Sequence, residues 1–147
     1  MLFAQQDSGK TTFHVVSAND KKDELIFSRR CTGDNRKMTV DGNGEANFYW
    51  GGVKNYNSSS FLADSALVDT VKSLITLSLI NDLNNYCFNH SCPKSACNYV
   101  VVIAEKETVY SASIDADYAD KNQSGFHKLD RLIGLLSDMN NKYAFPK

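Results

Sequence analysis

The sequence lacks the composition of a membrane-spanning or nucleic-acid-binding protein. No apolar run approaches the roughly 18 residues needed to cross a bilayer, so we predict no transmembrane segment. The formal net charge of -1 leaves no basic surplus for phosphate groups, and we expect no nucleic-acid partner. Prolines number only 2, and no repeat or low-complexity stretch interrupts the 147 residues, which predicts one domain of common size.

Signatures of catalysis and of cofactor binding are also missing. A catalytic cysteine needs a base, and nothing in the sequence directs His14, His90 or His127 to that role. Residues 4–11 fit a loosened phosphate-loop pattern, but such a loop must open a helix, whereas β-branched residues follow it here. We therefore predict no cofactor, and the sequence favours a role without catalysis.

The N-terminal residues resemble part of an export signal. Leu2-Phe3-Ala4-Gln5 resembles the end of the signal peptides of secreted Bacteroidetes proteins, with Ala4 as the small residue before the cleavage point. This resemblance covers these few residues alone and implies export. We expect residues 1–10 to be a flexible segment and residues 11–147 to form the single domain.

The strands are predicted from β-branched and aromatic residues that alternate with polar ones. The first third should form four of them, at residues 12–17, 24–31, 36–40 and 45–50. Asp41-Gly42-Asn43-Gly44 is typical of a tight hairpin turn. A polar loop is expected at Gly51-Gly52 and residues 56–60, and two later strands should occupy residues 98–104 and 108–115.

Two helices are predicted from the spacing of the large apolar residues. One long helix should run from Ala63 to about Tyr86. Since Leu77 and Ile80 fall outside its main apolar arc, we expect it to be buried on more than one side. A second, amphipathic helix is expected from about Ser124 to Asn140.

The order of these elements, ββββαββα, predicts the fold class. It fits an α+β domain in which two helices pack on one face of a mostly antiparallel sheet. In its layout of strands, long helix, cysteine-containing loop and strand pair, the chain resembles small secreted bacterial domains of unknown function. This resemblance implies no site residues.

The cysteines indicate disulfide bonds. Their number is even, and disulfides persist in oxidising compartments, so we predict a periplasmic or secreted protein bridged through Cys31, Cys87, Cys92 and Cys97. We favour Cys87 with Cys97, which would join the end of the long helix to the next strand, and Cys31 with Cys92. A zinc site at Cys87, His90, Cys92 and Cys97 is the alternative, but its ligand spacing is poor, and we predict no metal.

Two side-chain groups are candidates for function. The aromatic residues Tyr49, Trp50, Tyr56 and Phe61 could anchor a partner at the rim of the sheet, although Phe48 and Trp50 as plain core residues is the simpler interpretation. Asp115, Asp117 and Asp120 form an acidic cluster that could bind a divalent ion or act as acid and base, whereas a solvated loop is the simpler interpretation.

The function predicted from these features is protein binding. We expect an extracytoplasmic protein-binding domain without catalytic activity, for instance an inhibitor or an immunity protein. One alternative is a small hydrolase or metal-dependent enzyme that uses the acidic cluster. The other is a small-ligand carrier whose pocket lies between the sheet and the long helix.

Overall fold

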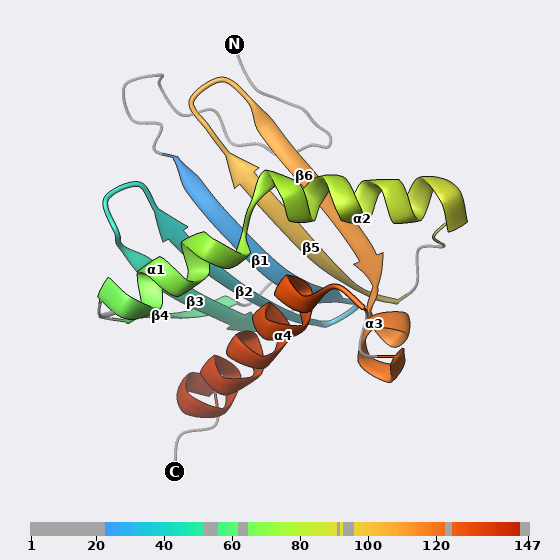
Figure 1. Cartoon of the computed structure of the whole chain (residues 1–147). Helices are drawn as coiled ribbons and strands as arrows, with labels where there is room; N and C mark the ends of the chain where they lie inside the picture. Colours follow the sequence, from blue (N-terminus) through green and yellow to red (C-terminus); the bar gives the residue numbers. More distant parts are fainter. Residues whose placement is uncertain are drawn as a thin grey trace.

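A six-stranded sheet is the framework of the computed structural model, which describes residues 23–51, 56–61, 65–90, 92, 96–122 and 125–144 (Figure 1). The strand order is β4-β3-β2-β1-β5-β6, and every neighbouring pair is antiparallel. The strands are β1 (Glu24–Cys31), β2 (Asp34–Asp41), β3 (Ala46–Gly51), β4 (Tyr56–Phe61), β5 (Cys97–Ala104) and β6 (Val109–Asp115). The predicted antiparallel sheet is confirmed.

Helices cover one face of this sheet, which confirms the α+β class. Figure 1 shows α1, α2 and α4 crossing the same side of the strands. The helices are α1 (Ser65–Leu74), α2 (Leu77–His90), α3 (Ala116–Asn122) and α4 (His127–Met139), and a π-helical turn, η2 (Asn140–Ala144), follows α4. No helix in the described part of the chain has the length and apolar content needed to span a bilayer.

The core forms where the helices meet the covered face of the sheet. Residues directly opposite one another in a sheet share a face, and Phe27 lies opposite Met38 on β2 and Val101 on β5. Met38 in turn lies opposite Phe48 on β3. These four side chains are completely buried, and the helices cover them with Leu83, Leu129 and Leu132, which are completely buried as well.

The single long helix predicted from Ala63 to Tyr86 is wrong, because the chain forms two helices with a break between them. Thr76 lies in the break, and its Oγ1 accepts a hydrogen bond of 3.2 Å from the Leu79 amide, which caps the first turn of α2. The break changes the rotational phase of the apolar pattern. Leu77 is consequently 44% exposed, whereas Ile80 is buried.

Two segments predicted as loops are regular structure. Tyr56–Phe61 forms the edge strand β4 and pairs with β3 along its whole length. The segment after Asp115 is the short helix α3, and the Asp115 carboxylate accepts a 3.0 Å hydrogen bond from the Tyr118 amide in its first turn. The strand predicted at residues 12–17 and the segment 1–10 lie outside the described residues.

The hairpin predicted between β2 and β3 is confirmed. The Asp41 carboxylate accepts hydrogen bonds of 2.8 Å from the Asn43 amide and 2.9 Å from the Glu45 amide. Gly44 has a φ of 82°, in the left-handed region that glycine adopts without steric cost. These side-chain and backbone features fold the turn locally, which is why the sequence alone predicts it.

Helix α2 lies along the outer strand β6. The Asn84 side-chain amide donates a 3.1 Å hydrogen bond to the Ser111 carbonyl oxygen. One turn later, the Cys87 sulfur lies 3.5 Å from the carbonyl oxygen of Ser113. The helix thus contacts the main chain of β6 at two alternate residues.

All four cysteines form disulfides, as predicted, but the favoured pairing is wrong. Cys31 is bonded to Cys97, and Cys87 to Cys92. Cys31 and Cys97 lie directly opposite each other on β1 and β5, with Cα atoms 4.1 Å apart. Cys87 and Cys92 lie at the end of α2 with Cα atoms 4.7 Å apart. The zinc alternative needs these sulfurs as thiolates, and none of the four cysteines is free.

Candidate functional site

A pocket of about 310 Å³ lies between one end of the sheet and the helices α3 and α4. The strands contribute one residue each from β1, β2 and β5, α3 contributes one, and α4 contributes three. In chain order the lining residues are Arg29, Arg36, Tyr99, Asp120, Ile133, Leu136 and Ser137. The volume is at the lower end of the range typical of small-molecule sites.

Strand register places two arginines side by side in this pocket. Arg29 on β1 lies directly opposite Arg36 on β2 and directly opposite Tyr99 on β5. Alternation along β1 puts Arg29 on the same face as Leu25 and Phe27, the face that the helices cover. Since like charges directly opposite each other in a sheet repel, an anion bound between the two guanidinium groups would be stabilised by both.

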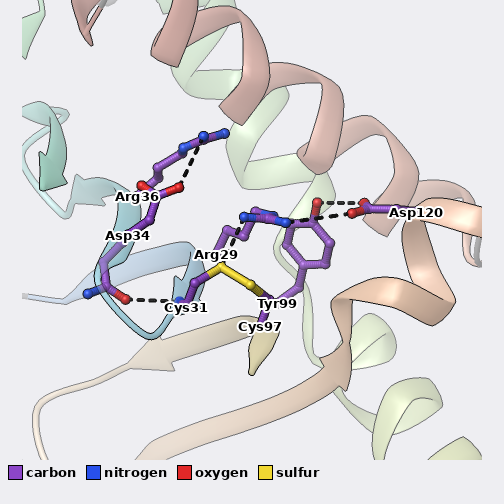
Figure 2. Close-up of a disulfide and its surroundings, with 8 residues drawn as sticks. Arg29, Cys31, Asp34, Arg36, Cys97, Tyr99 and Asp120 are labelled. Atoms are coloured by element: carbon purple, nitrogen blue, oxygen red, sulfur yellow. Dashed lines mark hydrogen bonds and ion pairs between the residues drawn. A yellow bond between two sulfur atoms is a disulfide. The ribbon is translucent and has the colours of Figure 1, made fainter. Parts of the chain in front are cut away.

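Asp120 and Tyr99 hold the position of Arg29 (Figure 2). The Tyr99 hydroxyl donates a 2.7 Å hydrogen bond to one carboxylate oxygen of Asp120. An Arg29 guanidinium nitrogen lies 3.9 Å from the other oxygen, an ion pair that is longer than a hydrogen bond. The same guanidinium lies 5.9 Å from the centre of the Tyr99 ring. The Tyr99 ring and the Asp120 carboxylate therefore both contact Arg29, but the ion pair with Asp120 is too long to be a hydrogen bond.

The hydroxyl of Tyr99 stays protonated in this setting. Tyr99 is 3% exposed, and its ring stacks on Phe27 with centroids 5.6 Å apart. Burial first, and then the hydrogen bond to the Asp120 carboxylate and its negative charge, raise the pKa of Tyr99 to about 12, against a lowering effect of Arg29. Tyr99 is consequently a hydrogen-bond donor to Asp120 throughout the physiological range.

Arg36 has a closer carboxylate partner, which is more exposed than Asp120. Its guanidinium donates a 3.3 Å hydrogen bond to the carboxylate of Asp34, which lies two residues earlier on the same strand. The Asp34 side chain is 54% exposed, and that of Arg36 is 27% exposed. Because exposed pairs of this kind contribute little free energy, Asp34 is a partner that a ligand can replace.

The Cys31 to Cys97 disulfide lies beside Arg29, next to the pocket (Figure 2). In the register of β1 and β5, this disulfide is on the same face as the Arg29 and Tyr99 pair, two residues further along. An Arg29 guanidinium nitrogen lies 3.0 Å from the Cys31 sulfur. The Asn35 side-chain oxygen accepts a 3.1 Å hydrogen bond from the Cys31 amide, which adds a tie to β2. The bridge thus holds together the strands that carry Arg29 and Tyr99.

The acidic cluster predicted at the end of β6 is divided between two tasks. Asp120 belongs to the pocket, while Asp115 accepts the amide hydrogen bond at the start of α3. Asp117 is exposed and does not line the pocket. Across the described residues, no group of three His, Cys, Asp or Glu side chains is arranged to hold a metal ion.

Two of the aromatic residues predicted to bind a partner, Tyr49 and Trp50, lie on opposite faces of the sheet. Trp50 is half-buried on the covered face and stacks on Phe48, with ring centroids 5.5 Å apart. Tyr49 points to the opposite face, where the Lys37 ammonium lies 4.7 Å from the centre of its ring. Tyr56 and Phe61 lie at the two ends of β4, and their side chains are outside what the structure describes.

The residues of the pocket were missed by the sequence analysis, Asp120 excepted. One local signal was present: β1 places an arginine where the alternation Leu25, Phe27 predicts another core residue. Its pairing with Arg36 and Tyr99 depends on strand register, which the sequence does not show. No protein-family model matches the chain, and a search of curated proteins finds no match.

Proposed function

We propose that this protein is an extracytoplasmic binding domain that holds a small anion in the pocket between the sheet and α4. The observation that supports this proposal is the pair of arginines, Arg29 and Arg36, which lie directly opposite each other on the wall of an open pocket. Each guanidinium presents several N–H donors in a fork that matches a carboxylate or phosphate group. An anion between them gains two charge-assisted partners at once.

The existing contacts of the two arginines leave room for such a ligand. Arg29 reaches its carboxylate partner Asp120 only at 3.9 Å, and Arg36 pairs with the exposed Asp34. An exposed pair of this kind contributes about 0 to 1 kcal/mol. Exchanging Asp34 for a ligand that also contacts Arg29 therefore costs little.

The proposed location, periplasmic or secreted, is supported by the two disulfides. The two bridges together include all four cysteines of the chain, as is typical of proteins that mature in an oxidising compartment. The pocket favours binding of a small ligand over the aromatic partner surface, because Tyr49 and Trp50 project from opposite faces of β3. It lies against α3 and α4, whereas the ligand-carrier alternative expected a pocket between the sheet and the long helix. Binding of a protein partner stays a prediction.

The test is the affinity of simple anions for the oxidised full chain. Binding of acetate and of inorganic phosphate is measured by calorimetry and by thermal stabilisation, at constant ionic strength set with sodium chloride. Arg36→Gln is compared with Arg30→Gln, which removes the same charge from an exposed residue on the opposite face of β1. Hydrogen bonds to charged groups contribute about 1.5 to 3 kcal/mol, so Arg36→Gln should lower the affinity roughly 10- to 100-fold.

Arg30→Gln should leave the affinity close to that of the wild type. Equal affinities in the wild type and both variants would overturn the proposal, since binding would then be unrelated to the pocket. Absence of any concentration-dependent stabilisation by either anion would overturn it as well.

A further inference from the structure

The pocket has two walls of different chemistry. The sheet contributes the charged wall with Arg29 and Arg36, whereas α4 contributes Ile133 and Leu136. Leu136 is 2% exposed and belongs to the core, and Ile133 is half-buried and packs against it. A ligand that filled the space would meet cations on one side and aliphatic carbon on the other.

We infer that the ligand is a small monocarboxylic acid with a compact apolar body, its carboxylate between Arg29 and Arg36 and its body against α4. The inference rests on the anion site proposed above and specifies its ligand class. A fully hydrated inorganic anion would leave the exposed part of Ile133 in contact with water, whereas an apolar body removes that surface and its own surface from water. The volume of about 310 Å³ also exceeds the need of a lone carboxylate.

Charge favours a single negative group. Two guanidinium groups and one carboxylate, Asp120, give the lining a formal charge of +1. Asp120 is held in place by the hydrogen bond from the Tyr99 hydroxyl, so a second ligand charge would lie near a carboxylate that stays in the pocket. A monoanion neutralises the lining residues when it takes the place of Asp34 at Arg36, whereas a second negative charge on the ligand would be repelled by Asp120 and by Asp34.

Asp34 competes with the ligand for Arg36. Its carboxylate oxygen is 3.3 Å from the Arg36 guanidinium, and the pair must open when a ligand carboxylate takes that place. Asp34→Asn removes the competing charge while keeping the shape of the side chain. This variant should therefore bind carboxylates more tightly than the wild type, a gain that misfolding cannot produce.

The experiment compares four probes on the oxidised full chain by calorimetry at constant pH and ionic strength. They are acetate, 4-methylpentanoate, the uncharged 4-methylpentan-1-ol and inorganic phosphate. We expect 4-methylpentanoate to bind at least tenfold more tightly than acetate and than phosphate, and the alcohol to bind more weakly than 4-methylpentanoate. In Ile133→Ser the preference for 4-methylpentanoate over acetate should shrink, while the affinity for acetate stays at the wild-type level. In Asp34→Asn both carboxylates should bind at least about threefold more tightly than they bind the wild type.

The contrary outcomes separate the ligand class from the site. Equal affinities for acetate and 4-methylpentanoate, or tighter binding of phosphate, would overturn the inferred class and leave the anion site standing. No binding of any anion would overturn both. Tighter binding of a short acetylated peptide ending in leucine than of 4-methylpentanoate would overturn the free acid as the ligand and indicate the C-terminus of a protein instead. Unchanged or weaker carboxylate binding in Asp34→Asn would overturn the inference that the ligand carboxylate replaces Asp34 at Arg36.

Discussion

The two disulfides close very different lengths of chain, and this difference predicts how much each one stabilises the fold. Cys31 and Cys97 are separated by 66 positions, whereas Cys87 and Cys92 are separated by 5. In the chain-entropy treatment, a bridge restricts the unfolded state by an amount that grows with the logarithm of the loop length. At these lengths it predicts about 4 kcal/mol for the long bridge and about 2 kcal/mol for the short one.

Both bridges can be removed by matched double substitutions to serine. We expect the variant lacking Cys31 and Cys97 to lose about 2 kcal/mol more free energy of unfolding than the variant lacking Cys87 and Cys92. Since whole domains are stabilised by only about 5 to 15 kcal/mol, the difference is readily measured. Denaturant unfolding followed through Trp50, the single tryptophan, which is half-buried and stacked on Phe48, gives the two free energies.

The slope of each unfolding curve provides a separate check. Without the long bridge the unfolded chain is less restricted and exposes more surface, so the dependence of the free energy on denaturant should be steeper. The short bridge should hardly change this slope. Equal free-energy losses in the two variants, or a larger loss for the Cys87 and Cys92 pair, would refute the argument from loop length.

Substitutions at three sites, Tyr99, Thr76 and the turn at Gly44, test local features of the fold. Because the pKa of Tyr99 is about 12 in the folded chain and ordinarily 10.0, its hydroxyl contributes stability that is complete below the ordinary pKa and is lost as pH rises through the folded one. The difference in free energy of unfolding between wild type and Tyr99→Phe should therefore narrow as the pH rises from 10.0 to about 12, with unfolding followed by circular dichroism. A constant difference would contradict the raised pKa of Tyr99. Thr76→Ala should cost about 1 kcal/mol through loss of the α2 cap and of the Lys128 hydrogen bond to the same oxygen. Thr76→Ser should retain most of this stability, and equal losses in the two variants by denaturant unfolding would exclude a role for the hydroxyl. Gly44→Ala should cost about 1 kcal/mol because of its positive φ, and Gly42→Ala, at an ordinary φ, should lower the thermal midpoint less; the reverse order would be contrary to expectation.

Elements whose cause is local were predicted well from the sequence. The strands β1 and β5 follow from the alternation and density of their apolar residues, and the turn at Asp41 follows from its side-chain hydrogen bonds and from Gly44. The order of strands and helices then predicted an antiparallel sheet with helices on one face. None of these conclusions needs knowledge of which strands are neighbours.

Elements that depend on the rest of the fold were missed. β4 contains the run Asn-Ser-Ser-Ser, which reads as a loop, and it forms a strand because β3 offers main-chain partners. The break at Thr76 was missed although Leu77 and Ile80 depart from the main apolar arc, because that departure also fits a single helix buried on more than one side. The pairing of β4 with β3 is a tertiary contact, and at the break Lys128 of α4 donates a 3.0 Å hydrogen bond to the Thr76 Oγ1.

The pocket could not be predicted for the same physical reason. Its polar residues come from five elements, and the register of β1 against β2 and β5 brings Arg29 to Arg36 and Tyr99. The pairing of Cys31 with Cys97 depends on that register too, which explains why the cysteines were recognised and their partners were not. Asp120 was a candidate because it is near two other aspartates, a neighbourhood that proved irrelevant to its contacts.

The contact between α2 and β6 has a consequence for self-association. An outer strand with open carbonyl groups can accept a strand from another molecule, and added strands bond to alternate residues. On β6 the Ser111 carbonyl already accepts a hydrogen bond from Asn84, and the Ser113 carbonyl lies against the sulfur of Cys87. Growth of an intermolecular sheet at this edge therefore requires α2 to move away first, so aggregation through β6 should begin from a partly unfolded chain.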